Sequence, residues 1–431
     1  MTYRPLTILL LMTFCVSHCA AQNDFVPNYD EAKVPSYELP DPLVSEAGKP
    51  VATAQQWNQT RRPELVQLFR DHVYGNSPAP CVVRSKEVSR VDDAAGGTAI
   101  RREVDVFFGA GDDAPSMRLL VYTPESTSHP VPAFLGLNFQ GNHSIEPDDR
   151  ISIPTSWMRD RRNGTTEGNV ATAEGRGVAA SRWSVQAITQ RGYGLVTIYY
   201  GDIDPDFDDG FENGIHAEFK KWNQSVAPKR RWGSIAAWAY GLSRALDYLE
   251  TDPSIDATKV AVLGHSRLGK TALWAGASDP RFAIVISNNS GCGGAALSRR
   301  AVGETVGRIN TSFPHWFCDQ FATYNQNESA CPVDQHQLIA LVAPRPVYVA
   351  SASEDKWADP RGEFLATVHA EPVYRLLGTE GFGPSGIPEM PRVNSPTRDG
   401  VIGYHLRDGK HDLTDYDWQQ YLSFADRFLK P

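Results

Sequence analysis

The fold is decided by the stretch Val260-Ala-Val-Leu-Gly-His-Ser-Arg-Leu-Gly-Lys-Thr-Ala-Leu-Trp274. Its first four residues are apolar or small and predict a buried strand, the glycines that follow predict a tight turn, and the Ala-containing end predicts a helix. A serine held between a strand end and a helix start exposes its hydroxyl at the sheet edge, beside free backbone N–H groups. Ser266 is therefore the predicted nucleophile.

The turn departs in two ways from the G-x-S-x-G pattern of hydrolases. Its second glycine, Gly269, comes one residue late, and two cations, Arg267 and Lys270, lie in the first helical turn. Positive charge at a helix N-terminus opposes the helix dipole and is a poor choice for stability alone. The pair predicts a site that handles negative charge.

The pattern on both sides of this stretch indicates an α/β protein. A hairpin is predicted from two alternating runs, 100–108 and 117–122, because one face of each is polar. Helical patterns at 232–250 and 270–277 separate short apolar runs at 131–137, 194–198, 260–263, 282–287 and 346–350. This alternation predicts a three-layer sandwich with a mostly parallel central sheet, as in α/β-hydrolases.

The chain length of 431 residues and the character of its first 21 residues predict an exported protein with a single domain. Residues 1–21 combine Arg4, an apolar run and small residues at the end, so they are interpreted as a signal peptide cleaved near Ala21, which implies a secreted or periplasmic protein. Residues 22–431 then form a single domain, with an N-terminal wrapping segment and insertions near 141–185 and 295–330. Long loops of this kind usually form lids or site walls.

Net charge and cysteine content limit which binding partners, metal sites and disulfides are expected. The net charge of −9 argues against nucleic acid and anionic membrane. Cysteine spacing matches no zinc motif, and neither a metal nor a cofactor is expected. Cys318 and Cys331 flank a polar loop and are the predicted disulfide, with four unpaired thiols (Cys81 and Cys292 included) as the alternative.

A nucleophilic serine needs a histidine base, which follows the acid in the chain order of α/β-hydrolases. Of the histidines after Ser266, only His411 follows a strand-like run and a turn (Asp408-Gly409) and precedes an amphipathic helix. His411 is therefore the predicted base. The alternative is that it merely caps the final helix.

The acid is sought where the run Pro346-Val-Tyr-Val-Ala-Ser-Ala-Ser-Glu-Asp355 leaves the sheet. Asp355 is the predicted acid, Glu354 is the alternative and Asp359 is a third option, because all three follow the carboxyl end of a strand. The backbone N–H of Arg267 is predicted to form the oxyanion hole, with a second donor in Asn138-Phe-Gln-Gly-Asn142.

Several motifs carry a family resemblance: Gly264-His-Ser-Arg-Leu-Gly-Lys270, Ser290-Gly-Cys-Gly-Gly-Ala-Ala296, Asp334-Gln-His-Gln-Leu-Ile-Ala-Leu-Val-Ala-Pro-Arg345, the loop of Asp355 and Trp357, and Gly409-Lys-His411. Together they resemble carbohydrate esterase family 15, the glucuronoyl esterases. The bacterial branch is indicated, since fungal members have cysteine where His265 stands. The resemblance is strong over residues 230–431 and general before them.

The resemblance implies an α/β-hydrolase that cleaves esters between (4-O-methyl-)D-glucuronic acid of glucuronoxylan and lignin alcohols. It implies Ser266 as nucleophile, His411 as base and Arg267 as an oxyanion-stabilising side chain. Lys270, Trp357 and Glu304 are implied as contacts to the sugar. Fungal members carry the acid just before the Ser-Gly-x-Gly-Gly segment, where this chain has Asn288-Asn289, so the resemblance to bacterial members places the acid at Asp355.

The function expected from the sequence is that of a monomeric serine esterase, free of metal and cofactor, that forms an acyl-enzyme with the glucuronoyl group. One alternative is an acetyl-xylan or other carbohydrate esterase with the same triad. The other is a non-catalytic carbohydrate-binding homologue of a hydrolase.

Overall fold

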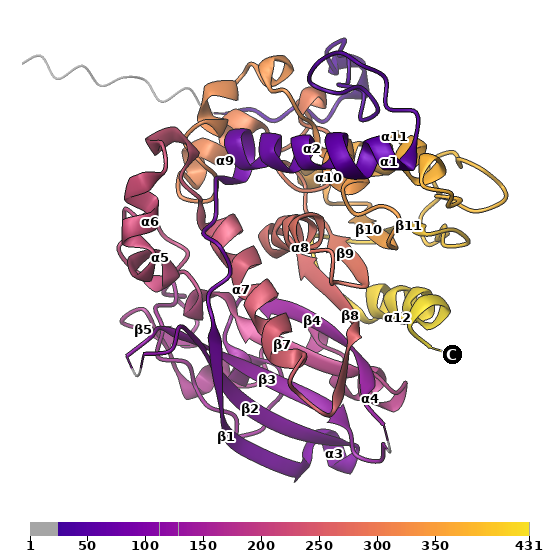
Figure 1. Ribbon diagram of the computed structural model, residues 1–431. Helices are drawn as coiled ribbons and strands as arrows, with labels where there is room; N and C mark the ends of the chain where they lie inside the picture. Colours follow the sequence, from indigo (N-terminus) through magenta and orange to yellow (C-terminus); the bar gives the residue numbers. More distant parts are fainter. Residues whose placement is uncertain (1–24, 112, 128, 431) are drawn as a thin grey trace, which may run out of the picture.

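A computed structural model describes residues 25–111, 113–127 and 129–430 (Figure 1). The predicted signal peptide lies outside these residues. A nine-stranded sheet runs through the molecule in the order β1-β2-β3-β7-β4-β8-β9-β10-β11. The six strands from β7 to β11 pair in parallel, and β1, β2 and β3 continue the sheet as antiparallel strands. The predicted mostly parallel sheet is thus confirmed.

The strands of this sheet are β1 (Val83–Asp93), β2 (Ala99–Phe108), β3 (Ser116–Pro124), β4 (Val131–Asn138), β7 (Gly194–Tyr199), β8 (Ile255–His265), β9 (Ile284–Asn288), β10 (Val347–Ala352) and β11 (Ile402–Arg407). A separate short hairpin joins β5 (Thr166–Glu167) and β6 (Val170–Ala171) within the insertion near 141–185. The helices are α1 (Ala54–Gln56), α2 (Arg62–Phe69), α3 (Ala94–Gly97), α4 (Val185–Gln190), α5 (Gly214–Glu218), α6 (Lys220–Ser225), α7 (Ser234–Leu249), α8 (Arg267–Ser278), α9 (Val306–Ser312), α10 (Gln335–Ala340), α11 (Pro360–Leu376) and α12 (Asp415–Leu429).

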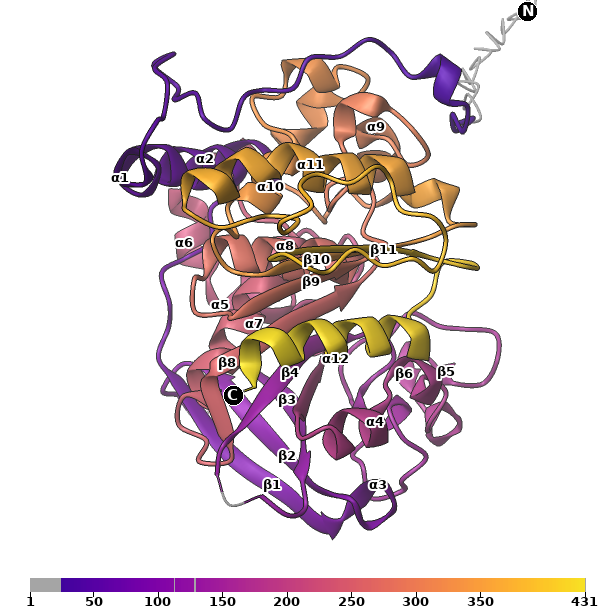
Figure 2. The same ribbon diagram turned by 90° about the vertical axis from the view of Figure 1, so that its right-hand side faces the viewer.

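Helices cover both faces of the sheet. Figure 2 shows α8, α10 and α11 on one side of the parallel strands and α12 with α4 on the other. Strand β8 supplies both cores, since Val260 and Val262 pack with α7 and α8 while Ala261 and Leu263 pack with α4 and α12. Alternate residues of a strand point to opposite faces, so an unbroken apolar run is what a strand between two helical layers requires.

Two parts of the fold differ from what the sequence pattern predicts. Strand β1 extends the sheet beyond the predicted hairpin, although its sequence is highly charged. It is a largely exposed edge strand, so backbone pairing with β2 holds it and no apolar signal is needed. Within the N-terminal part of the chain, residues 54–74 are helical and bury Trp57, Leu65 and Phe69 in the core.

The predicted disulfide between Cys318 and Cys331 is wrong. Both thiols are free and buried, and so is Cys292, while Cys81 is free and partly buried. Burial raises the pKa of Cys318 and Cys331 to about 12 in each case. Cys331 packs in the hydrophobic core, and the Cys318 thiol lies 3.9 Å from the Asp71 carbonyl oxygen.

The turn before Ser266 leaves no room for a side chain at Gly264. A Cβ there would collide with the backbone carbonyl of Leu268. Gly269 is similarly confined, because its Cβ would lie 3.0 Å from Ser290 Cβ and 3.1 Å from the Gly264 oxygen. The late glycine of the motif therefore allows α8 to pack closely against the ends of β8 and β9.

Gly264→Ala is expected to destabilise the protein by about 3 kcal/mol or more, because the collision is with backbone and no rotamer relieves it. Urea unfolding followed by tryptophan fluorescence measures this loss. Gly111→Ala is the matched control, since a Cβ there has no neighbour within 4 Å, and it should change stability by less than about 0.5 kcal/mol. Equal stability of the two variants would contradict this account of the turn.

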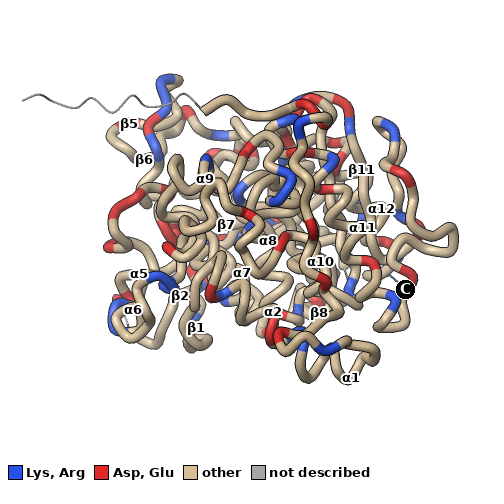
Figure 3. Tube along the Cα trace, turned by 90° about the horizontal axis from the view of Figure 1, so that it is seen from above, with Lys and Arg blue, Asp and Glu red and all other residues tan. Residues whose placement is uncertain are grey.

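Charged residues of both signs are interspersed over the surface of the described chain (Figure 3). They form no continuous basic stripe there of the kind that follows a nucleic-acid backbone. Among the helices of the described part, none is long and apolar enough to cross a membrane.

Candidate active site

Three loops deliver the predicted triad to one edge of the sheet. Ser266 follows β8, Asp355 follows β10 and His411 follows β11. Strands β8 to β11 are parallel neighbours, so the loops at their carboxyl ends lie side by side. Residues separated by up to 145 positions thereby meet at one place.

Ser266 has the strained backbone expected of a nucleophile on a sharp turn. Its φ of 58° and ψ of −130° lie in a region that residues with a Cβ rarely occupy. Its N–H donates to the Asn288 carbonyl at 2.9 Å, which ties the turn to the neighbouring strand β9. The chain then enters α8 at Arg267, so the free N–H groups of the first helical turn lie next to the serine.

His411 is held by a carboxylate. Its Nδ1 lies 2.6 Å from Asp355 Oδ2, and the Asp355 side chain is only 4% exposed, whereas that of His411 is 41% exposed. Since an ionised carboxylate only accepts hydrogen bonds, Nδ1 carries a proton and Nε2 is left free to act as a base. Ser266 and His411 line the same cavity without a direct hydrogen bond between them, a separation common in sites without substrate.

The two alternative acids have other surroundings. Glu354 is exposed, and its backbone N–H donates to the Gly409 carbonyl. Asp359 caps α11 and pairs with Arg300, with 2.8 Å between Oδ2 and Nε. Of the three candidates, Asp355 is the one whose carboxylate contacts His411.

A cavity of about 330 Å³ brings together the predicted triad, both cations of the turn and the two other predicted sugar contacts. It is lined by Ser266, Arg267, Lys270, Glu304, Asp355, Trp357 and His411, and also by Phe313, Trp316 and the segment from Asn289 to Gly291. The lining thus combines polar and charged groups with aromatic side chains. Such a mixture suits a sugar ring that bears an ester.

The ammonium group of Lys270 is bound by neighbouring protein atoms. Its Nζ donates to the carbonyls of Ser290 at 2.5 Å and Cys292 at 2.6 Å, and it lies 3.3 Å from Glu304 Oε2. An ammonium group has three protons, so these three partners use all of them. Lys270 therefore orients Glu304 and the Ser290 segment, while Glu304 Oε1 remains available in the cavity.

Trp357 stands at the rim beside Glu304. Its carbonyl accepts from the Glu304 N–H at 2.9 Å, and its indole meets the ring of Phe25 edge to face, with centroids 6.0 Å apart. The next residues of that N-terminal segment also contact the rim, since the Asn28 carbonyl accepts from the Gly303 N–H at 2.9 Å. The wrapping segment thus supports the wall of the site.

Arg267 points into a ring of aromatic side chains. Its guanidinium carbon lies 4.7 Å from the centroid of Trp316, 5.5 Å from that of Phe139 and 5.6 Å from that of Phe313. Phe139 belongs to the loop after β4, the predicted source of a second oxyanion donor, so that loop does lie next to Arg267. The face of an aromatic ring attracts a cation, and three rings restrict its position.

His411 also packs against a second histidine. The rings of His265 and His411 lie with centroids 4.5 Å apart, and His265 Nδ1 lies 2.6 Å from Asn288 Oδ1. Burial and the adjacent His411 lower the pKa of His265 well below its usual range, so this ring is neutral. Asn288 donates in turn to Asp417 and Tyr421 of α12.

Several residues of the site escape the sequence analysis. Glu363 of α11 is fully buried and accepts from the backbone N–H groups of Ser290 and Gly291 at 2.7 and 2.9 Å. Asp206 contacts Arg267 through its carboxylate. An arginine beside a nucleophile in a dry site needs a counter-charge, which is a signal to search for an acid, but spacing alone does not say which of the many acids supplies it.

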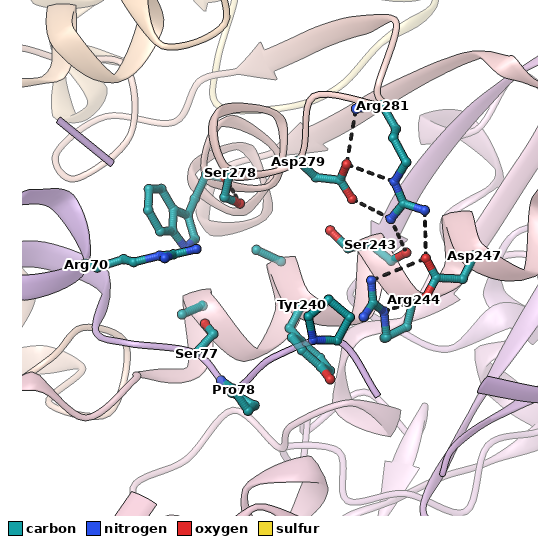
Figure 4. A pocket seen from close by; sticks show the side chains of 14 residues that line it. Arg70, Ser77, Pro78, Tyr240, Ser243, Arg244, Asp247, Ser278, Asp279 and Arg281 are labelled. Carbon is teal, nitrogen blue, oxygen red and sulfur yellow. Dashed lines mark hydrogen bonds and ion pairs between the residues drawn. The ribbon is translucent and has the colours of Figure 1, made fainter. Parts of the chain in front are cut away.

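A second cavity, of about 410 Å³, lies near the opposite end of α8 (Figure 4). Its arginines are mostly paired, since Arg281 binds Asp279 and Asp247, and Arg244 also binds Asp247. It contains serines but no histidine that would activate one. The chemistry of a serine hydrolase is therefore concentrated in the smaller cavity.

Known proteins that resemble this chain in sequence and structure are carbohydrate esterases. Residues 219–378 match the family model "Glucuronyl esterase, fungi". The chain is 55% identical over 402 residues to carbohydrate esterase MZ0003 of an unknown prokaryotic organism, covering 93% of this chain and 92% of that protein.

Two solved structures have the same fold over almost their whole length. One is a promiscuous CE15 esterase from a marine bacterial metagenome, with a TM-score of 0.86, 54% identity and coverage of 94% of this chain and 100% of that one. The other is the glucuronoyl esterase of Solibacter usitatus, with a TM-score of 0.85, 46% identity and coverage of 92% and 99%.

Proposed function

The chain belongs to carbohydrate esterase family 15, and we propose that it hydrolyses the ester between (4-O-methyl-)D-glucuronic acid of glucuronoxylan and lignin alcohols. The observation that carries the proposal is the His411–Asp355 hydrogen bond in the cavity that also holds Ser266 and Arg267. A base with a fixed tautomer, a strained serine and a cation beside it are the parts that acyl transfer needs.

The reaction proceeds in two halves. Ser266 Oγ attacks the ester carbonyl carbon while His411 Nε2 takes the hydroxyl proton, and Asp355 stabilises the imidazolium. The carbon–oxygen bond to the alcohol then breaks, and His411 gives its proton to the departing oxygen. Water next loses a proton to His411 and attacks the acyl carbon; the bond to Ser266 Oγ then breaks, His411 returns its proton to Oγ, and the uronic acid is released.

Negative charge develops on the carbonyl oxygen in both halves of the reaction. The esterified carboxyl group is neutral when it binds, so a cation beside it acts mainly in the transition state. Arg267 and the N–H groups at the start of α8 supply this stabilisation in the proposed mechanism. The presence of two cations in the first turn of α8 is thereby explained: Arg267 stabilises the oxyanion, and Lys270 holds Glu304.

Sugar recognition is assigned to Glu304, Trp357 and Lys270. Glu304 has one carboxylate oxygen free for ring hydroxyls, and Trp357 offers an aromatic face at the rim. Lys270 contributes by fixing Glu304, because its three protons are already bound. Export by the segment 1–21, the single domain 22–431 and a monomeric state belong to the same proposal.

A comparison of two esters tests the substrate assignment. Benzyl or methyl glucuronate is expected to be hydrolysed with a higher kcat/KM than acetylated xylan, because only the uronate ester places its sugar ring against Glu304. A preference for acetylated xylan would replace the proposal by an acetyl-xylan esterase.

Glu304→Ala sharpens this comparison. It is expected to reduce kcat/KM for methyl glucuronate by about 10- to 100-fold, the worth of a charge-assisted hydrogen bond. Activity on 4-nitrophenyl acetate, which has no sugar ring, should fall much less. The ratio of the two activities is insensitive to any loss of folded protein, and an unchanged ratio would remove Glu304 from the sugar site.

A further inference from the structure

A buried carboxylate behind Arg267 collects four hydrogen-bond donors. Asp206 is only 2% exposed. Its Oδ1 lies 2.9 Å from His315 Nε2 and accepts from Trp316 Nε1 at 2.7 Å, and its Oδ2 accepts from the Tyr200 hydroxyl at 3.0 Å and from Arg267 Nη1. Each oxygen thus has two donors, which is full occupancy for a carboxylate away from water.

These donors come from separate parts of the chain. Tyr200 and Asp206 follow β7, Arg267 begins α8, and His315 and Trp316 follow α9. Trp316 contacts Arg267 twice, directly through its ring face and indirectly through Asp206. The carboxylate therefore connects the turn of Ser266 and Arg267 with the loop after β7 and with the loop after α9, whose Trp316 lines the cavity.

Electrostatics keep Asp206 ionised. Burial alone would raise the pKa of this carboxyl group, but the hydrogen bond from His315, the charge of Arg267 and the hydrogen bond from Trp316 outweigh it and lower the pKa well below its usual range. A carboxylate in such a network cannot move without leaving donors unpaired. It is a fixed negative charge with Arg267 attached to it.

We propose that Asp206 is the positioning residue for Arg267: its immobile carboxylate, with the three aromatic rings, holds the guanidinium where the oxyanion of the reacting ester develops. The proposal rests on the oxyanion role proposed above for Arg267. Preorganised charge stabilises a transition state without reorganisation at the moment of reaction. A freely rotating arginine would have to be ordered first, and a misplacement of about 1 Å costs up to about 100-fold in rate.

If Asp206 acts only by positioning Arg267, the losses in kcat caused by substituting the two residues should not multiply. Arg267→Met, which keeps an apolar stem between the rings, is expected to lower kcat on methyl glucuronate by about 100-fold. Asp206→Asn should lower kcat by about 10- to 100-fold with KM nearly unchanged, since Asp206 does not line the cavity. The double variant should be no slower than Arg267→Met alone, because Asp206 has no effect without Arg267.

Asp204→Asn is the matched control. Asp204 lies two residues away, is 3% exposed and also pairs with a histidine, His216, at 2.8 Å, but it does not touch Arg267. It should leave kcat within about twofold of the parent protein, because remote positions contribute little to the transition state. Thermal unfolding of all variants separates a loss of fold from a loss of rate.

Tyr200→Phe provides a milder test if Asp206→Asn does not fold. It removes one donor from Asp206 Oδ2, leaves the ring and does not change the cavity lining. A loss of about two- to tenfold in kcat, absent in the Arg267→Met background, is expected because one donor to the carboxylate is lost while three remain.

The outcomes distinguish this proposal from the one it rests on. An unchanged kcat in Arg267→Met would overturn the oxyanion role itself. A loss in Arg267→Met without one in Asp206→Asn, or losses that multiply in the double variant, would overturn the positioning role of Asp206 alone.

Discussion

Ser266→Ala is expected to abolish hydrolysis of methyl glucuronate and leave the fold intact. The hydroxyl is the atom that forms the acyl-enzyme, and the remaining groups can only assist direct attack by water. The loss in kcat should reach about 10⁶-fold, the scale seen when a nucleophile is removed from a serine hydrolase. Alanine fits the turn because Ser266 already adopts its φ of 58° with a Cβ.

The measurement combines steady-state kinetics with covalent labelling. A phosphonofluoridate should add one phosphonyl group to the parent protein and none to Ser266→Ala. Ser278→Ala, at the other end of the same helix, is the control, because its hydroxyl donates to the Trp274 and Ala275 carbonyls of its own helix and lies outside the cavity of Ser266. Full activity in Ser266→Ala would refute the serine esterase mechanism.

Asp355→Asn is expected to lower kcat by about 10³- to 10⁴-fold. An amide has nearly the same shape, but its NH2 group donates where a carboxylate oxygen accepts, and it carries no charge to stabilise the imidazolium that forms on His411. The amide also allows the other tautomer of His411, in which Nε2 carries the proton and cannot act as a base. KM for methyl glucuronate should change little, since the carboxylate acts through His411.

Glu354→Gln is the adjacent control and should retain nearly full activity. Its side chain is exposed, and its contact with the loop of His411 runs through the backbone, from its N–H to the Gly409 carbonyl. Activity lost in Glu354→Gln and kept in Asp355→Asn would move the acid by one residue. Retention of activity in both variants would leave His411 without a partner and contradict the triad.

The sequence pattern of a segment was sufficient to predict a strand or helix where the residues of that segment alone indicate its structure. The apolar runs at β4, β7, β8, β9 and β10 predict the parallel strands because burial between two helical layers requires both faces to be apolar. Strand β1 and the helices of residues 54–74 were missed. Their charged or mixed sequences gain stability from pairing and packing with distant residues, which a local window does not contain.

The candidate site shows the same division. Order along the chain and position after strands were enough to choose Ser266 and His411 and to narrow the acid to Asp355, Glu354 or Asp359, since the carboxyl ends of parallel strands meet at one edge. Order did not separate Asp355 from Glu354, because neighbouring residues differ only in the direction of their side chains. Sequence order also did not reveal that all three protons of the Lys270 ammonium group are bound by protein atoms.

By itself, the stretch from Val260 to Trp274 determined the turn, the serine proposed as nucleophile and the presence of two cations, because glycine spacing and residue type act locally. Only the tertiary structure decided what those cations contact. Asp206 lies 61 residues before Arg267 and Glu304 lies 34 residues after Lys270. Coulomb attraction and hydrogen bonding depend on distance in space, and folding brings these charges together in a site with little water to screen them.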